Sequence, residues 1–460
     1  MIRFIDRKDE LRLLEEEWSS ARAKLIILYG RRRIGKTRLI KEFIKDKKGI
    51  FYIAEDMKKE LIIEDLKKEI SKFFNDEFLG QLKIENWNIL FEYLCRIVPK
   101  NERFYFVIDE FSYIIKNSPE VLSILQKYWD LYLSKTKIFI ILSGSLLGLM
   151  NQTLNSSSPL YGRRSRDIQL RKLPFKYSRE FLKMDLENSL KTYFSIDGVP
   201  EYLIKASEYE NFETFVKKEF FNKYGYFYNE PYFLLGQGFK ELRTYFSMVN
   251  ALAYGHTEPT RIANFVGLRT REIYPYLENL IRLGLVKREP NILNPRKGLY
   301  LISDKLLDFW FNFVFKYRTF IELEQMDLKT LDFDQYFGKI FESFVKDEIV
   351  PVIYGKRFDK IGKWWYKDKE IDILALNEKS KELLAVECKW EDYVEPKKVC
   401  RSLLESLGHI QWYKDQRKEY LAIFAKSFKE KIDEYNGLRV HCYDLNDIEK
   451  ILTQASDSKF

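Results

Sequence analysis

The chain has 460 residues and a mass of 55.5 kDa, a length that predicts about three domains. Hydrophobic residues make up 46% and charged residues 32%, which allows a large core and excludes a disordered or collagen-like chain. Lys and Arg number 78 against 69 Asp and Glu, a net charge of +9, so a polyanion such as nucleic acid is a natural partner class. The basic residues gather locally, with nine cations and two anions in residues 31–48.

The sequence carries no signal for export or membrane insertion. Residues 1–18 lack the apolar run of a signal peptide, and the most apolar stretch, residues 138–150, is too short to span a bilayer. The four cysteines show no paired spacing, which argues against a disulfide framework or a zinc cluster. We therefore expect a soluble cytoplasmic protein with no membrane partner.

A phosphate-binding loop follows the first predicted strand. A charged helix, residues 8–20, precedes the apolar strand KLIILYG, and GRRRIGKT then matches the pattern G-x-x-x-x-G-K-[ST] ahead of a helix. Glycines let backbone N–H groups face phosphate, the lysine reaches the outer phosphates, and the threonine hydroxyl holds Mg²⁺. We expect ATP and Mg²⁺ to bind here, and the nucleotide-binding residues to be Gly30, Arg31, Arg32, Arg33, Ile34, Gly35, Lys36, Thr37 and Arg38.

Two further apolar strands end in polar residues suited to the same site. FYFVIDEF ends in Asp109, expected to hold Mg²⁺, and Glu110, expected to orient or deprotonate the attacking water. KIFIILSGS ends in Ser143 and Ser145, either of which could sense the terminal phosphate. Taken alone, the acidic pair would be read as a strand end capping the next helix, but the neighbouring phosphate loop favours a nucleotide site.

Several ordered motifs together resemble a known family. GRRRIGKT, FVIDEF, LSGSLLGLM, SPLYGRRSRDIQL, LPF and DGVPEYL resemble the archaeal ATPase family, which is related to the AAA+ and STAND classes. The resemblance covers about the first half of the chain and implies a five-stranded core followed by a helical lid. It makes Arg163 or Arg164 a candidate for the arginine that meets a nucleotide in the same chain or a neighbouring one. It also suggests a homo-oligomer, with a monomer as the alternative. An exposed basic loop is the alternative reading of these arginines.

Residues 245–302 are expected to form three short helices and a hairpin. YFSMVNALAYG, PTRIANFVG and RTREIYPYLENLIRLGLV are the helices, with residues 273, 277, 280 and 281 on one buried face, and VKREP, NPRKG and LYLIS form a two-stranded wing. This is a winged-helix arrangement, whose third helix commonly enters the DNA major groove. We predict DNA contacts from Arg269, Arg271 and Tyr274. Packing or protein docking is the alternative, and Pro275 makes the start of the third helix uncertain.

A segment that is apolar nearly all round follows the wing. SDKLLDFWFNFVFKYRTFIE is predicted to be a buried helix with an aromatic core. Residues 296–345 resemble the uncharacterised carboxy-terminal domain that accompanies many archaeal ATPases.

A second chemical signal lies between residues 370 and 389. EIDILAL and LLAVECKW read as strands joined by a polar turn, and a hairpin centred between residues 379 and 380 places Asp372 opposite Glu387. Side chains alternate along a strand, so Lys389 lies on the face of Glu387. A predicted helix could bring Glu342 to the same end of the hairpin.

These four residues resemble the PD-(D/E)xK nuclease superfamily. The resemblance makes Asp372 and Glu387 metal ligands, Glu342 the helical glutamate and Lys389 the residue that positions water or stabilises charge, with Mg²⁺ or Mn²⁺ as the metal. Ile371 stands where the superfamily has proline. A hairpin with solvated charges, or a nuclease fold that binds without cleaving, are the alternatives.

The expected fold class is α/β, with a P-loop AAA+ core, a helical lid, a winged helix and a restriction-endonuclease-like domain. The expected boundaries are 1–180 for the ATPase core, 181–244 for the lid, 245–302 for the winged helix, 303–335 for the connecting helix and 336–460 for the nuclease-like domain. The function predicted is an ATP-hydrolysing protein with a metal-dependent, DNA-directed nuclease-like domain. An ATP-switched regulator that binds DNA or protein is the alternative.

Overall fold

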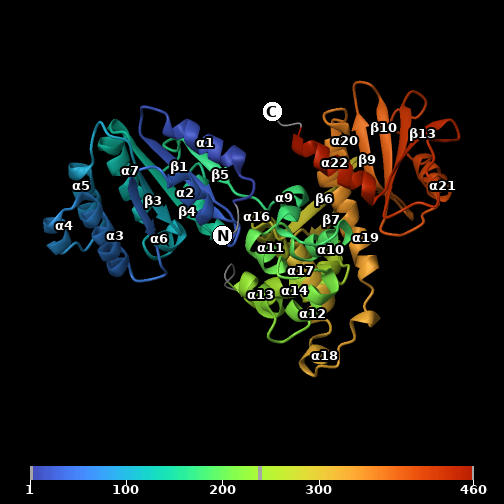
Figure 1. Cartoon of the computed structure of the whole chain (residues 1–460), viewed down its shortest axis with the longest axis horizontal. Helices are drawn as coiled ribbons and strands as arrows, with labels where there is room; N and C mark the ends of the chain where they lie inside the picture. Colours follow the sequence, from blue (N-terminus) through green and yellow to red (C-terminus); the bar gives the residue numbers. More distant parts are fainter. Residues whose placement is uncertain (1–3, 237–240, 458–460) are drawn as a thin grey trace. The chain divides into compact units, whose positions relative to one another are not determined.

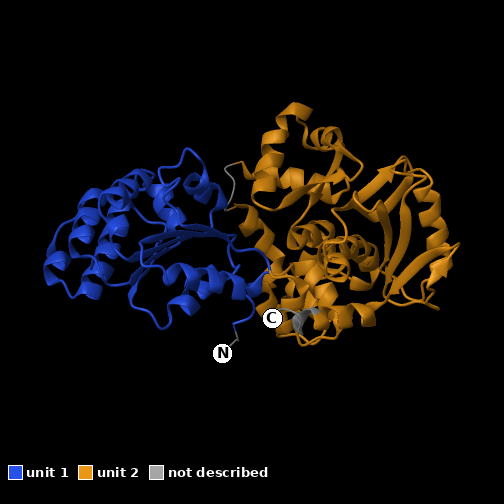
Figure 2. Cartoon of the chain, turned by 90° about the horizontal axis from the view of Figure 1, so that it is seen from above, with its two compact units in different colours: residues 1–172, 199–201 blue, residues 173–198, 202–460 orange. Residues whose placement is uncertain are grey.

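The computed structural model describes residues 4–236 and 241–457. They form two compact units, residues 1–172 with 199–201 and residues 173–198 with 202–460 (Figure 2). The chain therefore passes between the units three times, after residues 172, 198 and 201.

The first unit is built on a five-stranded parallel sheet in the order β2-β3-β4-β1-β5. Its central strands are apolar over their whole length, as expected of parallel strands that are buried on both faces. The structure confirms the three strands predicted here and the number of strands that the family resemblance implies. The strands are β1 Lys24–Tyr29, β2 Gly49–Ile53, β3 Phe104–Asp109, β4 Ile138–Gly144 and β5 Arg166–Gln169.

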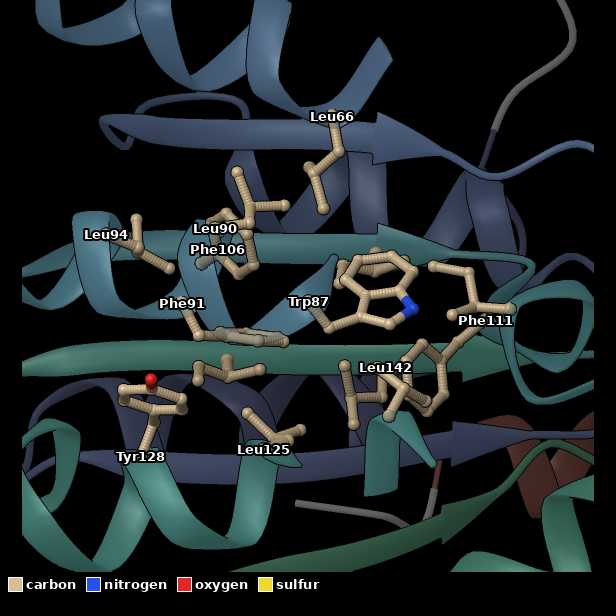
Figure 3. Packing of buried hydrophobic residues seen from close by; sticks show 14 of the residues in the cluster. Leu66, Trp87, Leu90, Phe91, Leu94, Phe106, Phe111, Leu125, Tyr128 and Leu142 are labelled. Carbon is tan, nitrogen blue, oxygen red and sulfur yellow. The ribbon is translucent and has the colours of Figure 1, made fainter. Parts of the chain in front are cut away.

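Helices cover both faces of this sheet. One face packs Ile26 and Leu28 of β1 against Leu14 of α1 and Leu39 of α2. The opposite face carries the larger cluster, in which Trp87, Phe91 and Tyr128 pack over the strands (Figure 3). The helices are α1 Lys8–Trp18, α2 Lys36–Ile44, α3 Lys59–Phe74, α4 Glu77–Gln81, α5 Trp87–Ile97, α6 Phe111–Asn117, α7 Val121–Leu131 and α8 Leu147–Leu154.

The second unit begins with short helices and continues into three helices and a hairpin. The short helices are α9 Phe175–Ser178, α10 Leu186–Ile196, α11 Pro200–Ala206, whose first two residues belong to the first unit, α12 Phe212–Glu219 and α13 Tyr226–Gly236. The three helices and the hairpin predicted for residues 245–302 are present. They are α14 Leu242–Ala253, α15 Pro259–Val266, α16 Tyr274–Arg282, β6 Val286–Asn291 and β7 Asn294–Ile302.

Three details of this segment differ from the prediction. The third helix starts only at Tyr274, because Pro275 occupies its first turn and a separate 3-10 turn, Thr270–Glu272, precedes it. Residues 294–298 are not a turn but the first half of β7, so the hairpin turns at residues 291–294. Ile281 is 38% exposed, at the edge of the face that buries Ile273, Leu277 and Leu280.

The apolar segment after the hairpin is buried as predicted, but it is not one α-helix. It runs as α17 Lys305–Phe309, a π-helical segment Trp310–Phe315 and α18 Arg318–Glu322. A second π-helical segment, Val345–Ile349, lies between α19 Phe333–Phe344 and α20 Val350–Tyr354. The wider π turns accompany dense aromatic packing, in which Phe309 and Phe313 contact Phe333 and Tyr336.

The chain ends in a six-stranded mixed sheet in the order β12-β13-β11-β10-β9-β8 (Figure 1). Helix α21 packs Cys400, Leu403 and Leu407 against it, and α19 packs against β10, where Phe341 contacts Trp390. The elements are β8 Lys360–Tyr366, β9 Lys369–Asn377, β10 Glu382–Lys389, α21 Pro396–Leu407, β11 Lys418–Ala425, β12 Glu434–Tyr435, β13 Leu438–Tyr443 and α22 Leu445–Asp457. Among the described residues, no helix combines the length and apolarity needed to cross a membrane.

Candidate functional sites

Two glycines shape the loop between β1 and α2. A side chain at Gly30 would place its Cβ 2.6 Å from the Leu170 carbonyl oxygen, so only glycine fits there. Gly35 has φ +94°, a left-handed conformation that favours glycine, and it precedes the first residue of α2. The loop thus carries backbone N–H groups directly to a helix amino terminus, where anions bind favourably.

Lys36 and Thr37 project from the first turn of α2 toward the end of β3. The Lys36 ammonium is buried and donates to the carbonyl oxygens of Gly30 at 3.0 Å and Arg31 at 3.2 Å. Burial lowers the pKa of Lys36, and Glu110 and Asp109 oppose this shift. Thr37 Oγ1 donates to Asp109 Oδ2 at 2.5 Å. A hydroxyl and a carboxylate are hard oxygen donors of the kind that Mg²⁺ prefers, so Thr37 and Asp109 fit such an ion.

Glu110 is held at the carboxyl end of the sheet beside these residues. Its backbone is left-handed, with φ 53°, and its carboxylate accepts a 2.6 Å hydrogen bond from Ser145 Oγ. Ser143 is fully buried, and its hydroxyl has no hydrogen-bond partner among the described residues. Of the two serines predicted from the sequence, Ser145 is therefore the one in contact with the acidic pair.

The arginines of the loop reach different partners. Arg32 donates to the Tyr113 hydroxyl, and Arg33 pairs with Glu201 at 3.3 Å. Ile34 is fully buried, while Arg38 is exposed on α2.

The two arginines of the GRRSR segment are anchored by neighbouring carboxylates. Arg163 makes a two-pronged pair with Asp130 at 2.7 and 2.8 Å, and Arg164 lies 2.8 Å from Asp167. An arginine that is to reach a nucleotide must first leave these partners.

The predicted DNA-contacting residues lie at the surface. Arg269, Arg271 and Tyr274 are exposed, but both arginines belong to the 3-10 turn region before α16 and not to the helix itself. Their position at the amino end of α16 keeps them available to a ligand.

In the carboxy-terminal sheet, the hairpin has the register that the sequence predicts. Asn377 pairs with Glu382 and Ile373 with Val386, so the hairpin is centred between residues 379 and 380 and Asp372 faces Glu387. Asp372 is 6% exposed and accepts a 2.9 Å hydrogen bond from the Cys388 N–H. Lys389 donates to Glu387 at 2.8 Å. Glu342 lies on α19, as predicted.

The structure adds two residues that the sequence did not single out, Lys363 and Glu370. The Lys363 ammonium on β8 lies 3.0 Å from Glu342, 3.4 Å from Glu370 and 3.8 Å from Asp372. The only sequence signal was a lone lysine within the otherwise uncharged strand segment IGKWWY. We call Glu342, Lys363, Glu370, Asp372, Glu387 and Lys389 the carboxylate cluster.

Burial and charge crowding shift the acids of the cluster. Burial raises the pKa of Asp372 well above its ordinary value, and the nearby Glu342 and Glu387 raise it further. Burial also raises the pKa of Glu342, which Lys363 opposes. Burial works against the charge of Lys389, but Glu387 outweighs it, so the pKa of Lys389 is raised.

The donor chemistry of the cluster fits a divalent cation. Four carboxylates against two ammonium groups give a formal charge of −2 when all are ionised, and oxygen donors suit Mg²⁺ or Mn²⁺. The cluster is not a preformed cage, however. Across residues 4–236 and 241–457, no three His, Cys, Asp or Glu side chains stand where they could hold a metal ion together.

Two known protein families match separate parts of the chain. Residues 4–206 match a family described as an ATPase domain predominantly from Archaea. Residues 310–400, which contain the carboxylate cluster, match a family described as Archaea bacterial proteins of unknown function. The "Uncharacterized ATP-binding protein MJ0423" of Methanocaldococcus jannaschii is 56% identical over 48 residues, which are 10% of this chain and 81% of that protein.

Two longer similarities concern most of the chain. The Walker-type ATPase PABY2304 of Pyrococcus abyssi has a solved structure that is 22% identical, with a TM-score of 0.51 over 67% of this chain and 96% of that one, and it shows the fold. The "Uncharacterized protein MJECL04" of M. jannaschii is 32% identical over 441 residues, covering 93% of this chain and 97% of that protein. The chain therefore belongs to the family of P-loop ATPases found predominantly in Archaea, and its residues 310–400 match a second family, whose function is unknown.

Proposed function

We propose that the chain is an ATP-hydrolysing protein whose nucleotide state controls a metal-dependent, DNA-directed nuclease-like site in the carboxylate cluster. In the ATPase unit, Lys36 would bind the outer phosphates and Thr37 and Asp109 would hold Mg²⁺. Glu110, fixed by Ser145, would orient the attacking water. Arg163 or Arg164 would meet the nucleotide once released from its carboxylate partner.

The register of the β9–β10 hairpin is the observation that carries the nuclease proposal. It brings Asp372 and Glu387 to one end of the sheet, where Lys389 and Glu342 also lie. A divalent cation bound to Asp372 and Glu387 would supply an activated water and neutralise charge at phosphate. Lys389 would position that water or stabilise the developing charge, and the antiparallel hairpin that continues into parallel strands β10, β11 and β13 agrees with a restriction-endonuclease-like fold.

Exposed basic residues support DNA as the substrate. Residues 256–300 contain eight cations and four anions, and Arg269, Arg271 and Tyr274 stand at the amino end of the helix that a winged helix places in the major groove. In this proposal residues 1–180 are the ATPase core, 181–244 the lid, 245–302 the winged helix, 303–335 the connecting helices and 336–460 the nuclease-like domain. A homo-oligomer would supply an arginine to a neighbouring nucleotide.

The second candidate is an ATP-switched regulator that binds DNA or protein without cleaving. The position of Lys363 favours it, because an ammonium group already lies among Glu342, Glu370 and Asp372. A cluster partly neutralised in this way could stabilise the fold and do no chemistry.

Cleavage of a panel of single- and double-stranded DNA with Mg²⁺ or Mn²⁺, with and without ATP, distinguishes the two candidates. The variants are Asp372→Ala, Lys36→Ala and, as a matched control, Asp368→Ala, whose carboxylate is exposed in the turn before β9. Cleavage that is lost in Asp372→Ala, kept in Asp368→Ala and altered by ATP only when Lys36 is present supports the nuclease. DNA binding without cleavage under every condition supports the regulator.

A further inference from the structure

Lys363 reaches the carboxylate cluster beside an irregularity in the pairing of β8 with β9. Strand β8 pairs Gly362 with Leu374 and Trp364 with Ile371, so the register shifts around Lys363. Two residues of β9, Asp372 and Ile373, stand opposite the single residue Lys363, so the extra residue lies in β9. Such bulges redirect side chains and often lie beside functional sites. At this irregularity the Lys363 ammonium lies within 4 Å of Glu342, Glu370 and Asp372.

The hairpin of β6 and β7, which we call the wing, bonds to the backbone of β8 at this point. The Ile292 N–H at the tip of the wing donates a 3.0 Å hydrogen bond to the Lys363 carbonyl oxygen. Asn291, only 3% exposed, donates from Nδ2 to the Trp365 carbonyl oxygen at 2.8 Å. A side chain on Gly362 would come within 3.2 Å of Ile292, so the glycine allows the wing tip to approach this closely.

The wing also contacts the helical side of the cluster. Glu289 on β6 is paired with Lys346, four residues after Glu342. One hairpin is thus attached both to the strand that carries Lys363 and to the helical run that carries Glu342. Between these attachments lies a groove of about 540 Å³, lined by Lys287, Ile292, Lys346 and Gly362 among others. The wing is therefore bonded to its neighbours at a few points and separated from them by the groove elsewhere. Such an arrangement suits an element that can dock and release.

We propose that the docked wing holds Lys363 as a resident cation in the carboxylate cluster, and that divalent metal binds there only when this ammonium is withdrawn. The inference deepens the proposed nuclease function and rests on it for its biological meaning, but the competition between ammonium and metal is independent of cleavage. Two cations cannot share the same few carboxylate oxygens without strong repulsion in a partly buried site. The wing would then control metal binding to the carboxylate cluster through the position of its tip.

Binding of Mn²⁺ alone to the full chain, without nucleotide, tests the proposal by calorimetry and by the paramagnetic resonance of free Mn²⁺. Lys363→Met removes the charge and keeps most of the chain length, so we expect Mn²⁺ affinity to rise at least tenfold. Adding Asp372→Asn should abolish the gain. Lys363→Arg should keep Mn²⁺ excluded, and Lys360→Met, an exposed lysine of the same strand that pairs with Glu378, should bind as the parent protein does.

A second variant acts on the wing and leaves the cluster unchanged. Asn291→Ala removes the bond to Trp365, so it should raise Mn²⁺ affinity in the same direction and by less than Lys363→Met. It keeps the test informative if Lys363→Met does not fold. Equal or weaker Mn²⁺ binding in both variants overturns the proposal, as does a gain that survives Asp372→Asn. These results are separate from the cleavage assay, because tighter metal binding without cleavage would reject the nuclease and leave the wing-held lysine supported.

Discussion

The hydroxyl of Ser145 donates a hydrogen bond of 2.6 Å to the carboxylate of Glu110, and so ties the end of β4 to the residue after β3. Glu110 also has φ 53°, a conformation that costs a non-glycine residue free energy and persists where the surroundings enforce it. The backbone and the hydroxyl together fix a carboxylate next to Asp109, Thr37 and Lys36. This arrangement suits a group that must orient one water molecule.

Replacement of Glu110 should uncouple binding from hydrolysis. We expect Glu110→Gln to lower the ATPase rate by about 100-fold or more, the usual contribution of a positioned acid or base, and to leave ATP affinity within about twofold, because the lysine and the phosphate loop remain. Ser145→Ala should lower the rate by about tenfold through loss of one hydrogen bond to a charged group. Steady-state hydrolysis and nucleotide binding measure the two effects, with the exposed Ser156→Ala as control. An unchanged ATPase rate in Glu110→Gln would mean that another residue orients the attacking water.

Protonation of Asp308 should make stability depend on pH. Burial raises the pKa of Asp308 to about 7 from its ordinary value near 3.8, against the influence of Lys339. The folded chain then holds a proton that the unfolded chain has lost between pH 4 and 7, so stability from this group falls as pH rises, by up to about 1.4 kcal/mol per pH unit. Between pH 5 and pH 7, the free energy of unfolding measured with urea should fall less in Asp308→Asn than in the parent protein. An equal fall in the free energy of unfolding in the two proteins would contradict the raised pKa of Asp308.

Truncation of Phe194 should strongly destabilise the second unit. Phe194 on α10 is fully buried and contacts Phe344 and Trp390, with ring centroids 5.6 and 5.7 Å away. Phe194→Ala removes this packing and leaves a cavity, at a cost of about 3–5 kcal/mol. Chemical denaturation followed by tryptophan fluorescence measures the change. Tyr224→Ala, at a position that is 85% exposed, should change stability by less than about 0.5 kcal/mol.

Removal of the basic residues before α16 should weaken DNA binding uniformly across sequences. If Arg269 and Arg271 contact phosphates, the double alanine variant should reduce the salt slope of log affinity by about 2, roughly one for each arginine. Fluorescence anisotropy across a salt series measures that slope. Lys414→Ala, an exposed lysine of the carboxy-terminal domain, is the control. An unchanged slope would indicate that the helices and wing dock a protein instead of DNA.

The sequence predicted those features that rest on short-range chemistry. The phosphate loop follows from two glycines and a lysine at fixed spacing, and the β9–β10 register follows from counting outward from a polar turn. Apolar runs located the central strands because both faces of a parallel strand are buried. The late start of α16 could have been placed with more weight on Pro275, since proline favours the first turn of a helix.

The position of Lys363 could not be predicted in this way. It depends on the bulge in β9 opposite Lys363 and on Gly362, which leaves room for the Ile292 side chain. It also depends on the N–H of Ile292, 71 residues earlier in the chain, which bonds to the Lys363 carbonyl oxygen. The partners of Arg32 and Arg33 were equally hidden, because Tyr113 and Glu201 are remote in sequence and no motif links them to the loop. Tertiary proximity of this kind has no local signature.

The return of residues 199–201 to the first unit has an evolutionary consequence. Glu201, the partner of Arg33 in the phosphate loop, is encoded after the 26 residues 173–198 that belong to the other unit. A single genetic crossover after residue 172 would replace Glu201 along with the second unit. A single crossover after residue 201 would leave residues 173–198, which include α10, behind with the first unit. Recombination would need three coordinated junctions, after residues 172, 198 and 201, so we expect the two units to have been inherited together.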